Sequence, residues 1–171
     1  LLKAAANEAQ LAGVMAHEMA HVVLRHGTNQ VSKANLLQLP AAVAAGAVGG
    51  GSLVGQLAQV GIGLGYNSIL LSYSRGAENE ADALGARIMA EAGYNPLEMA
   101  RFFEKIEAEG GARGPQFLSS HPNPGNRMRN VEAEIRTLPR GSYGFQTGQF
   151  ARAQQAASAL PAPSRTRTAM R

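Results

Sequence analysis

The chain of 171 residues contains no cysteine and no tryptophan, and aromatic residues make up only 5% of it. Without cysteine there are no disulfide bonds and no thiolate metal sites, so any bound metal must be held by His, Asp or Glu. Charged residues are also sparse, at 16% against 45% hydrophobic residues. This balance is typical of a globular protein, and the length predicts one domain with a sizeable core.

Acidic residues are absent from the C-terminal end. Residues 135–171 carry six of the sixteen basic residues and no acid, which leaves ten basic against twelve acidic residues in the rest of the chain. The net charge of +4 therefore belongs to the end of the chain, and we expect no nucleic-acid partner, which would require clustered Lys and Arg on structured elements. Residues 140–171 are rich in Gly, Gln, Ala, Ser, Pro and Arg without hydrophobic periodicity. This composition predicts a basic, disordered tail.

A long central segment lacks charge altogether. Residues 34–74 contain no Asp, Glu, Lys or Arg and are rich in glycine. The run is long enough to cross a bilayer, but its glycine clusters and Pro40 weaken that interpretation. We expect residues 33–74 to form an apolar lid or a membrane-associated segment, with insertion of residues 40–66 into a membrane as the alternative.

Hydrophobic periodicity predicts a mainly α fold. The expected helices cover residues 7–33, 75–92, 95–110 and 123–138. Gly93 is expected to end the second helix, and Asn95 to cap the third, with Pro96 in its first turn. Asn123 is expected to open the last helix. The helices belong to one domain over residues 1–139.

His17, Glu18 and His21 form the pattern HExxH within the stretch VMAHEMAHVVLRHG. Residues four apart lie on one face of a helix, so His17 and His21 can direct their imidazoles at a single point, and two neutral imidazoles suit Zn²⁺. Glu18 is offset by one residue and can reach a water molecule beside the metal, where a general base is needed. The motif alone is a weak signal, because it arises by chance in about 2% of chains of this length. The alternatives are a buried histidine pair bonded to backbone and a charged helix face.

The surroundings of Glu18 favour the metal site. The residues that flank it are apolar: Val14, Met15, Met19, Val22 and Val23. A glutamate buried among such residues is costly to desolvate without a partner, and a metal removes that difficulty. His26 lies about 180° around the expected helix from His17, so we assign it to a structural or surface position.

A catalytic zinc needs a third protein ligand. Glu78 and Asp82 lie four residues apart on the second expected helix, so both can face the first helix. One acid can bind zinc while the other accepts a hydrogen bond from the second nitrogen of a ligand histidine. Glu80 points to the opposite side and is expected in solvent.

Three ordered segments of the chain resemble a known family. HEMAHVVLRHG, SRGAENEADALGARIMAEAGYNP and SSHPNPGNRMRNVE are similar to the HtpX and CAAX-prenyl-protease-like family of zinc metalloendopeptidases. The family pattern of HExxH, SRxxExxAD and HPxxxxR is complete and spans residues 14–132. Among family members, the bacterial periplasmic BepA-like group is nearest.

The resemblance implies roles for the residues that match these motifs. His17, His21 and Glu78 would be the zinc ligands. Glu18 would be the catalytic base, and Asp82 would support a ligand from outside the coordination sphere. The distal motif implies that His121 and Arg127 lie near the zinc. His121 either stabilises the oxyanion or caps the metal as a fourth ligand, and Arg127 is the other candidate for stabilising the oxyanion; from the sequence alone, both would be surface residues.

The resemblance further implies a gluzincin-type catalytic domain that hydrolyses peptide bonds in proteins or peptides. It implies a place in the bacterial cell envelope, periplasmic or membrane-associated, with a role in protein quality control and outer-membrane assembly partners. Family members usually carry strands upstream of the HExxH helix, and we expect the sequence to be a fragment that lacks them. The alternatives are a non-catalytic, zinc-bearing chaperone or assembly factor and an integral membrane protease.

Overall fold

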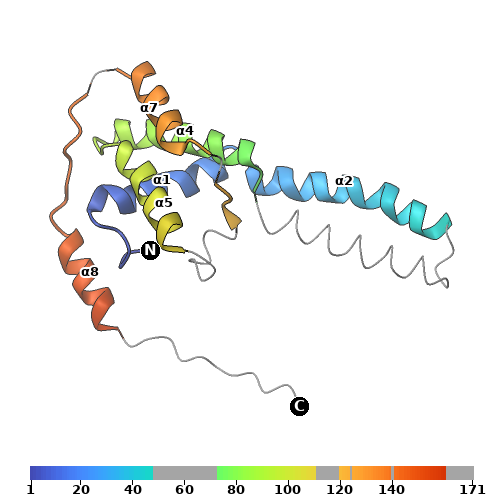
Figure 1. Ribbon diagram of the computed structural model, residues 1–171, viewed down its shortest axis with the longest axis horizontal. Coiled ribbons are helices and arrows are strands. Elements are labelled where there is room, and N and C mark those ends of the chain that lie inside the picture. The colour runs from blue at the N-terminus through green and yellow to red at the C-terminus, as the bar shows by residue number, and fades with distance from the viewer. Residues whose placement is uncertain (48–72, 111–119, 124, 140, 161–171) are drawn as a thin grey trace, which may run out of the picture.

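The computed structural model describes residues 1–47, 73–110, 120–123, 125–139 and 141–160. Its helices are α1 (Glu8–Val23), α2 (His26–Ala47), α4 (Arg75–Glu91), α5 (Leu97–Gly110), α7 (Arg127–Thr137) and α8 (Phe150–Ala159). No strand occurs in these parts of the chain, so the mainly α fold predicted from the sequence is confirmed. Figure 1 shows α1, α4, α5 and α7 gathered into one bundle, from which α2 projects.

Helix α1 lies at the centre of the bundle, against both α4 and α5. Small residues permit the close approach of these helices. A Cβ atom added to Gly85 of α4 would lie 3.3 Å from the backbone nitrogen of His17, and one added to Gly13 would lie 2.8 Å from Cα of Met99. The contact between α1 and α4 therefore brings the HExxH residues next to the SRxxExxAD segment.

The hydrophobic core fills the space between the four bundle helices. Its buried residues are Val14, Ala16, Ala86, Met89, Met99, Ala100, Phe102, Phe103, Ile106 and Val131, together with Ala5. Most of the large members come from α5, whereas α1 and α4 each contribute one alanine and one larger residue. Burial of Phe and Met side chains from α5 is the main source of hydrophobic stabilisation.

The single helix predicted over residues 7–33 is wrong, because the chain breaks between α1 and α2. Leu24 is the C-cap of α1, and its backbone N–H donates to the carbonyl of Ala20. The next residue, Arg25, adopts the left-handed conformation with φ of 55°. A non-glycine residue in this region is uncommon and interrupts the right-handed helix. The new helix direction begins at His26.

Most of the large apolar residues of α1 do not lie on its buried face. Met15, Met19, Val22 and Val23 are all more than half exposed, with Val22 at 77%. The buried residues of this helix are Gln10, Gly13, Val14, Ala16, His17, Ala20 and His21. Close packing against α4 selects small side chains, so the buried face combines alanines with the two histidines.

The other helix ends follow the sequence with one exception. Asn95 accepts a hydrogen bond from the backbone of Leu97 at 3.1 Å, and Gly93 has φ of 80°, as predicted. Helix α7, which corresponds to the helix predicted over residues 123–138, begins later than predicted, at Arg127. The side chain of Asn123 accepts from the backbone of Gly125 at 2.7 Å, which makes it part of a turn instead of a helix cap.

Part of the predicted tail is ordered. Residues 150–159 form α8, and the backbone of Thr147 donates to Oε2 of Glu8 at 3.0 Å. Gln154 also donates to the backbone carbonyl of Ala5 at 2.9 Å. These contacts, made to the start of the chain, differ from the disorder that the composition predicts. The division into a catalytic domain and a tail itself stays a prediction.

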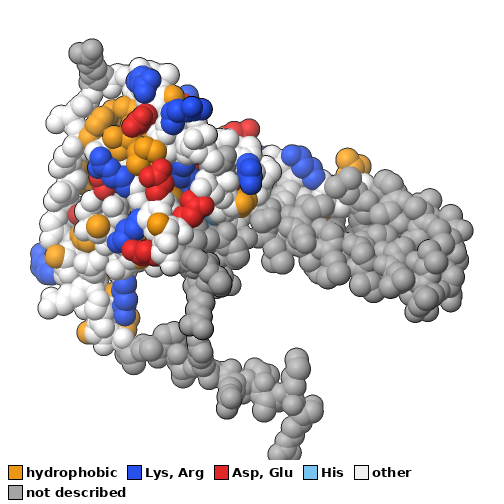
Figure 2. Space-filling model, viewed as in Figure 1, with side chains coloured by type: hydrophobic (Ala, Val, Ile, Leu, Met, Phe, Trp, Pro, Cys, Tyr) orange, Lys and Arg blue, Asp and Glu red, His pale blue; other side chains and the backbone are white. Residues whose placement is uncertain are grey.

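Most of the uncharged segment, residues 48–72, lies outside the described residues, so the lid and membrane interpretations stay predictions. Over the described part of the chain, no helix combines the length and apolar character that crossing a membrane requires. On the face of the bundle shown in Figure 2, acidic and basic side chains are interspersed with apolar ones.

Candidate metal centre

Four buried side chains from three parts of the chain converge on one point. The candidate ligand atoms of His17, His21, Glu78 and His121 all lie within 4.8 Å of one another. Helix α1 supplies the two HExxH histidines one turn apart, and α4 supplies Glu78 in its first turn. The structure thus brings together the three ligands that the resemblance implies, with His121 beside them.

Short distances join these groups. Nε2 of His17 lies 3.0 Å from Nε2 of His21, and Oε2 of Glu78 lies 3.4 Å from Nε2 of His17. The other carboxylate oxygen of Glu78 lies 3.4 Å from Nε2 of His21. The two Nε2 atoms and the carboxylate oxygens of Glu78 therefore surround one common point.

Asp82 determines which nitrogen of His17 faces this point. Its Oδ1 lies 3.0 Å from Nδ1 of His17, and both side chains are buried. A carboxylate only accepts hydrogen bonds, so the single proton of a neutral His17 resides on Nδ1 and the lone pair of Nε2 points at Glu78. This is the supporting role predicted for one member of the pair Glu78 and Asp82.

The donor set fits a divalent metal. Lone pairs of imidazole and carboxylate groups that face each other repel unless a metal cation or a proton lies between them. Two histidines and one glutamate, without cysteine, match the ligands of a catalytic zinc site, which leaves a further position for water or substrate. The residues present can therefore hold such an ion.

The pKa shifts agree with these ligand forms. Burial acts to raise the pKa of Glu78, but its close contacts with the imidazoles of His121, His17 and His21 hold it well below its ordinary value, so the carboxylate is ionised. Burial lowers the pKa of His21, and the neighbouring His17 and His121 add to this, so His21 is neutral. Burial also opposes the charged form of His17, but Asp82 and Glu78 raise its pKa overall. A proton therefore competes with a metal for His17.

Arg127 lies buried behind Glu78 and Asp82, the two buried acids of α4. Its Nε is 2.7 Å from Oδ2 of Asp82, and one terminal nitrogen is 3.2 Å from Oε2 of Glu78. The guanidinium also covers the ring of Phe103, 4.3 Å from its centroid. Arg127 therefore compensates the charge of two buried carboxylates and fixes their orientation.

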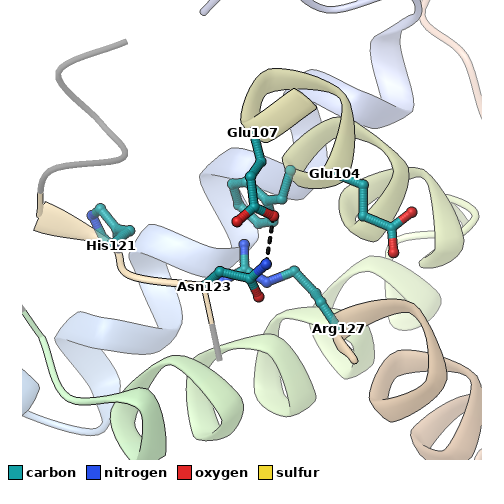
Figure 3. Close-up of a pocket in the computed structure, with 6 residues that line it drawn as sticks. Glu104, Glu107, His121, Asn123 and Arg127 are labelled. Atoms are coloured by element: carbon teal, nitrogen blue, oxygen red, sulfur yellow. Dashed lines mark hydrogen bonds between the residues drawn. The ribbon is translucent and has the colours of Figure 1, made fainter. Parts of the chain in front are cut away.

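His121 closes the site from a separate segment. Its Nδ1 lies 3.2 Å from Oε1 of Glu78, and its Nε2 lies 3.4 Å from Oε1 of Glu18. Two bonds anchor this segment: the backbone of Tyr73 donates to Ser120 at 3.0 Å, and the amide of Asn123 donates to Glu107 of α5. Figure 3 shows His121, Asn123 and Arg127 in sequence along this part of the chain.

Glu18 lies at the solvent-facing rim, with its side chain 48% exposed. Four of its five apolar neighbours on α1, all except Val14, are exposed as well, so the predicted desolvation of this carboxylate is wrong. The case for the metal rests instead on the buried ligands. An exposed carboxylate beside a metal site is accessible to water and to a peptide.

Two residues of the site were missed from the sequence. His26 is buried, with Nδ1 2.9 Å from Nδ1 of His21, because the break at Arg25 cancels the angle expected for a continuous helix. Its Nε2 lies 3.0 Å from Glu80, whose side chain is 67% exposed as predicted. Tyr73 stacks on His21 with ring centroids 4.1 Å apart. The only sequence signals were proximity to the motifs: His26 follows HExxH, and Tyr73 immediately precedes SRxxExxAD.

An open groove of about 430 Å³ lies beside the candidate ligands. It is lined by Glu18, His21, Val22, Arg25, Gly27, Thr28 and Tyr73. Burial raises the pKa of the Tyr73 hydroxyl, and the charges of Glu18 and Glu78 add to the effect, so the phenol stays protonated. The groove offers room for a ligand next to Glu18, with a hydroxyl group on its wall.

Comparisons with known proteins agree with this site. The family described as Peptidase family M48 matches residues 1–135. The chain is 34% identical over 147 residues to the beta-barrel assembly-enhancing protease of Escherichia coli (strain K12), which covers 77% of the chain and 29% of that protein. It is 33% identical over 124 residues to the mitochondrial metalloendopeptidase OMA1 of Schizosaccharomyces pombe. This match covers 71% of the chain and 35% of that protein.

A third relative is the metalloprotease YcaL of Escherichia coli (strain K12), 28% identical over 130 residues, which covers 75% of the chain and 50% of that protein. The chain thus corresponds to between 29% and 50% of the length of these three relatives.

Proposed function

Because this chain belongs to peptidase family M48, as the resemblance of its three motifs predicted, we propose that it is the catalytic part of a zinc metalloendopeptidase. The observation that carries the proposal is the convergence of His17, His21 and Glu78 beside the exposed carboxylate of Glu18. Binding alone would not need an exposed carboxylate at the rim of the metal site. Hydrolysis needs a base there.

His17, His21 and Glu78 would hold the zinc, with Asp82 and Arg127 behind them. Zinc at this position supplies Lewis acidity, which polarises the scissile carbonyl and acidifies an attacking water. The ion pairs of Arg127 with both acids support a positioning role for this residue over stabilisation of the oxyanion.

Glu18 would act as the general base. Its carboxylate takes the proton of the attacking water and then delivers it to the departing amine. The open groove beside Glu18 would receive the peptide. The exposed carboxylate of Glu18 would be accessible to the attacking water.

His121 would cap the metal in the resting protein as a fourth ligand. The position of its Nδ1, 3.2 Å from Oε1 of Glu78 and 3.4 Å from Nε2 of His17, supports this role over stabilisation of the oxyanion. In this role, His121 would occupy the position that the carbonyl of a bound peptide takes. The imidazole would therefore have to leave the metal before cleavage.

We further propose that the substrates are proteins or peptides of the bacterial cell envelope, where the chain would serve protein quality control. The support is similarity to a protease that enhances beta-barrel assembly. Outer-membrane assembly proteins are the partners that this similarity favours, and a periplasmic or membrane-associated location follows from them.

Digestion of casein by the purified chain tests the proposal. Cleavage should occur, stop when a zinc chelator is added and return when zinc is restored. A zinc-loaded chain that binds unfolded proteins but never cleaves them would instead indicate a chaperone.

A further inference from the structure

A chain of contacts leads from the candidate ligand His21 to the surface. Nδ1 of His21 lies 2.9 Å from Nδ1 of His26, and Nε2 of His26 lies 3.0 Å from Oε2 of Glu80. His21 and His26 are buried, whereas Glu80 reaches the solvent. The contacts join α1, the first residue of α2 and α4.

We propose that His26 and Glu80 determine the tautomer of His21, so that His26 is a positioning residue of the metal centre. This inference rests on the zinc site proposed above. Glu80 only accepts hydrogen bonds, so the proton of a neutral His26 resides on Nε2 and its Nδ1 is an acceptor. His21 must then donate from its own Nδ1, which leaves the lone pair of its Nε2 directed at the metal position.

The arrangement parallels the one at His17. There, Asp82 accepts directly from Nδ1 of the ligand histidine. At His21 the acceptor is an imidazole, and the carboxylate stands one residue further out. Both ligands thus receive a partner that fixes the ring orientation and leaves Nε2 unprotonated.

The break between α1 and α2 makes this contact possible. In a continuous helix His26 would lie on another face from His21, but the left-handed Arg25 turns the chain so that His26 returns to the site. Tyr73 stacks on a face of the His21 ring, with an interplanar angle of 25°. His21 is therefore restrained both by its hydrogen bond and by its ring plane.

His26 is not placed to be a ligand itself. Its Nδ1 faces His21 and its Nε2 faces Glu80, and it does not belong to the group of ligand atoms that converge. A buried imidazole held between a ligand and a carboxylate acts through its neighbour.

Zinc affinity of matched variants, measured by competition with a chromophoric chelator, tests the inference. His26→Leu keeps a similar volume but removes the acceptor, and should weaken zinc binding about 10–100-fold. His26→Asn places an amide oxygen close to the position of Nδ1 and should bind zinc within about threefold of the parent. Glu80→Ala should weaken binding severalfold, whereas Glu91→Ala, an exposed acid of the same helix, should leave it unchanged.

A second measurement reads the tautomer without metal. Long-range ¹H–¹⁵N spectra of the metal-free full chain should place the proton of His21 on Nδ1 in the parent and in His26→Asn, and should show a mixture in His26→Leu. Absence of zinc binding by the unsubstituted protein would refute the proposed metal site. The spectra would still show whether the contact with His26 determines the tautomer of His21.

Two results would overturn the inference: a proton on Nε2 of His21 in the metal-free parent, or unchanged zinc affinity in His26→Leu. Should His26→Leu fail to fold, equal affinities of Glu80→Ala and Glu91→Ala would overturn it as well.

Discussion

Oδ1 of Asp82 lies 3.0 Å from Nδ1 of His17, although the two residues are 65 positions apart. Helix α4 contributes to the site in successive turns, because Glu78, Asp82 and Gly85 share one face. Glu78 faces the metal position, Asp82 supports His17, and Gly85 permits the backbone of α1 to come close. The SRxxExxAD segment therefore provides a ligand, a partner for a ligand and the contact that aligns both.

Replacement of Glu18 by Gln should leave zinc bound and abolish peptide cleavage. The amide keeps the size of the side chain but cannot take a proton, and loss of a general base typically costs about 10²–10⁴-fold in rate. Casein digestion and metal analysis of the same sample measure both effects. Full activity in Glu18→Gln would exclude the proposed role of this carboxylate.

His17→Ala should lose the metal itself. The substitution removes one of three proposed ligands, and leaves Oδ1 of Asp82 without the imidazole that donates to it. Metal content after dialysis should fall from about one zinc per chain to a small fraction, whereas Glu18→Gln serves as the control that retains it. Stoichiometric zinc in dialysed His17→Ala would contradict the ligand assignment.

Arg127→Met should destabilise the metal-free protein by about 3 kcal/mol, because it leaves the buried carboxylates of Glu78 and Asp82 without their cation. Zinc should reduce this loss, since the metal compensates the charge of Glu78. Urea denaturation with chelator and with zinc measures the two states. The control is Arg129→Met, which replaces an exposed arginine of the same helix. Equal free energies of unfolding for the two variants would refute the proposal that Arg127 compensates the buried carboxylates.

The local geometry of the site could be predicted from spacing. Residues four apart share a helix face, so the pairing of His17 with His21 and of Glu78 with Asp82 required only that each segment be helical. The family motifs then joined the two helices and added His121 and Arg127. The structure places all six side chains at one site.

The break at Arg25 could not be predicted, because no residue of the sequence Leu-Arg-His interrupts a helix by its intrinsic propensity. The turn brings His26 to partners, His21 and Glu80, that exist only in the folded protein. The exposed face of α1 was missed for a related reason. Periodicity finds apolar residues, but close helix packing buried the small ones and left Met15 and Met19 outside.

Acid should remove the stabilising contribution of Glu98. Burial acts to raise its pKa, but hydrogen bonds from Asn7, Arg101 and Gln10 lower it overall, so the unfolded chain binds more protons than the folded one. The contribution is complete above the ordinary value of 4.5 and is lost as the pH falls through the lowered pKa. Denaturation of the parent and Glu98→Gln should differ by roughly 1 kcal/mol at neutral pH, and the difference should vanish as the pH falls below the lowered pKa. A pH-independent difference would contradict this.

Gly13→Ala should destabilise the bundle even though alanine favours helices. The new Cβ would lie 2.7 Å from Cβ and 2.8 Å from Cα of Met99, and the backbone atom cannot move aside without shifting α5. Overpacking of this kind costs roughly 2 kcal/mol, more than the gain of about 1 kcal/mol in helix propensity. Gly76→Ala is the control, because its Cβ would lie 3.8 Å from the nearest atom, Oγ of Ser74, and should be neutral or stabilising. Thermal denaturation of both variants measures the contrast. Equal melting temperatures would show that α1 and α5 do not meet at this distance.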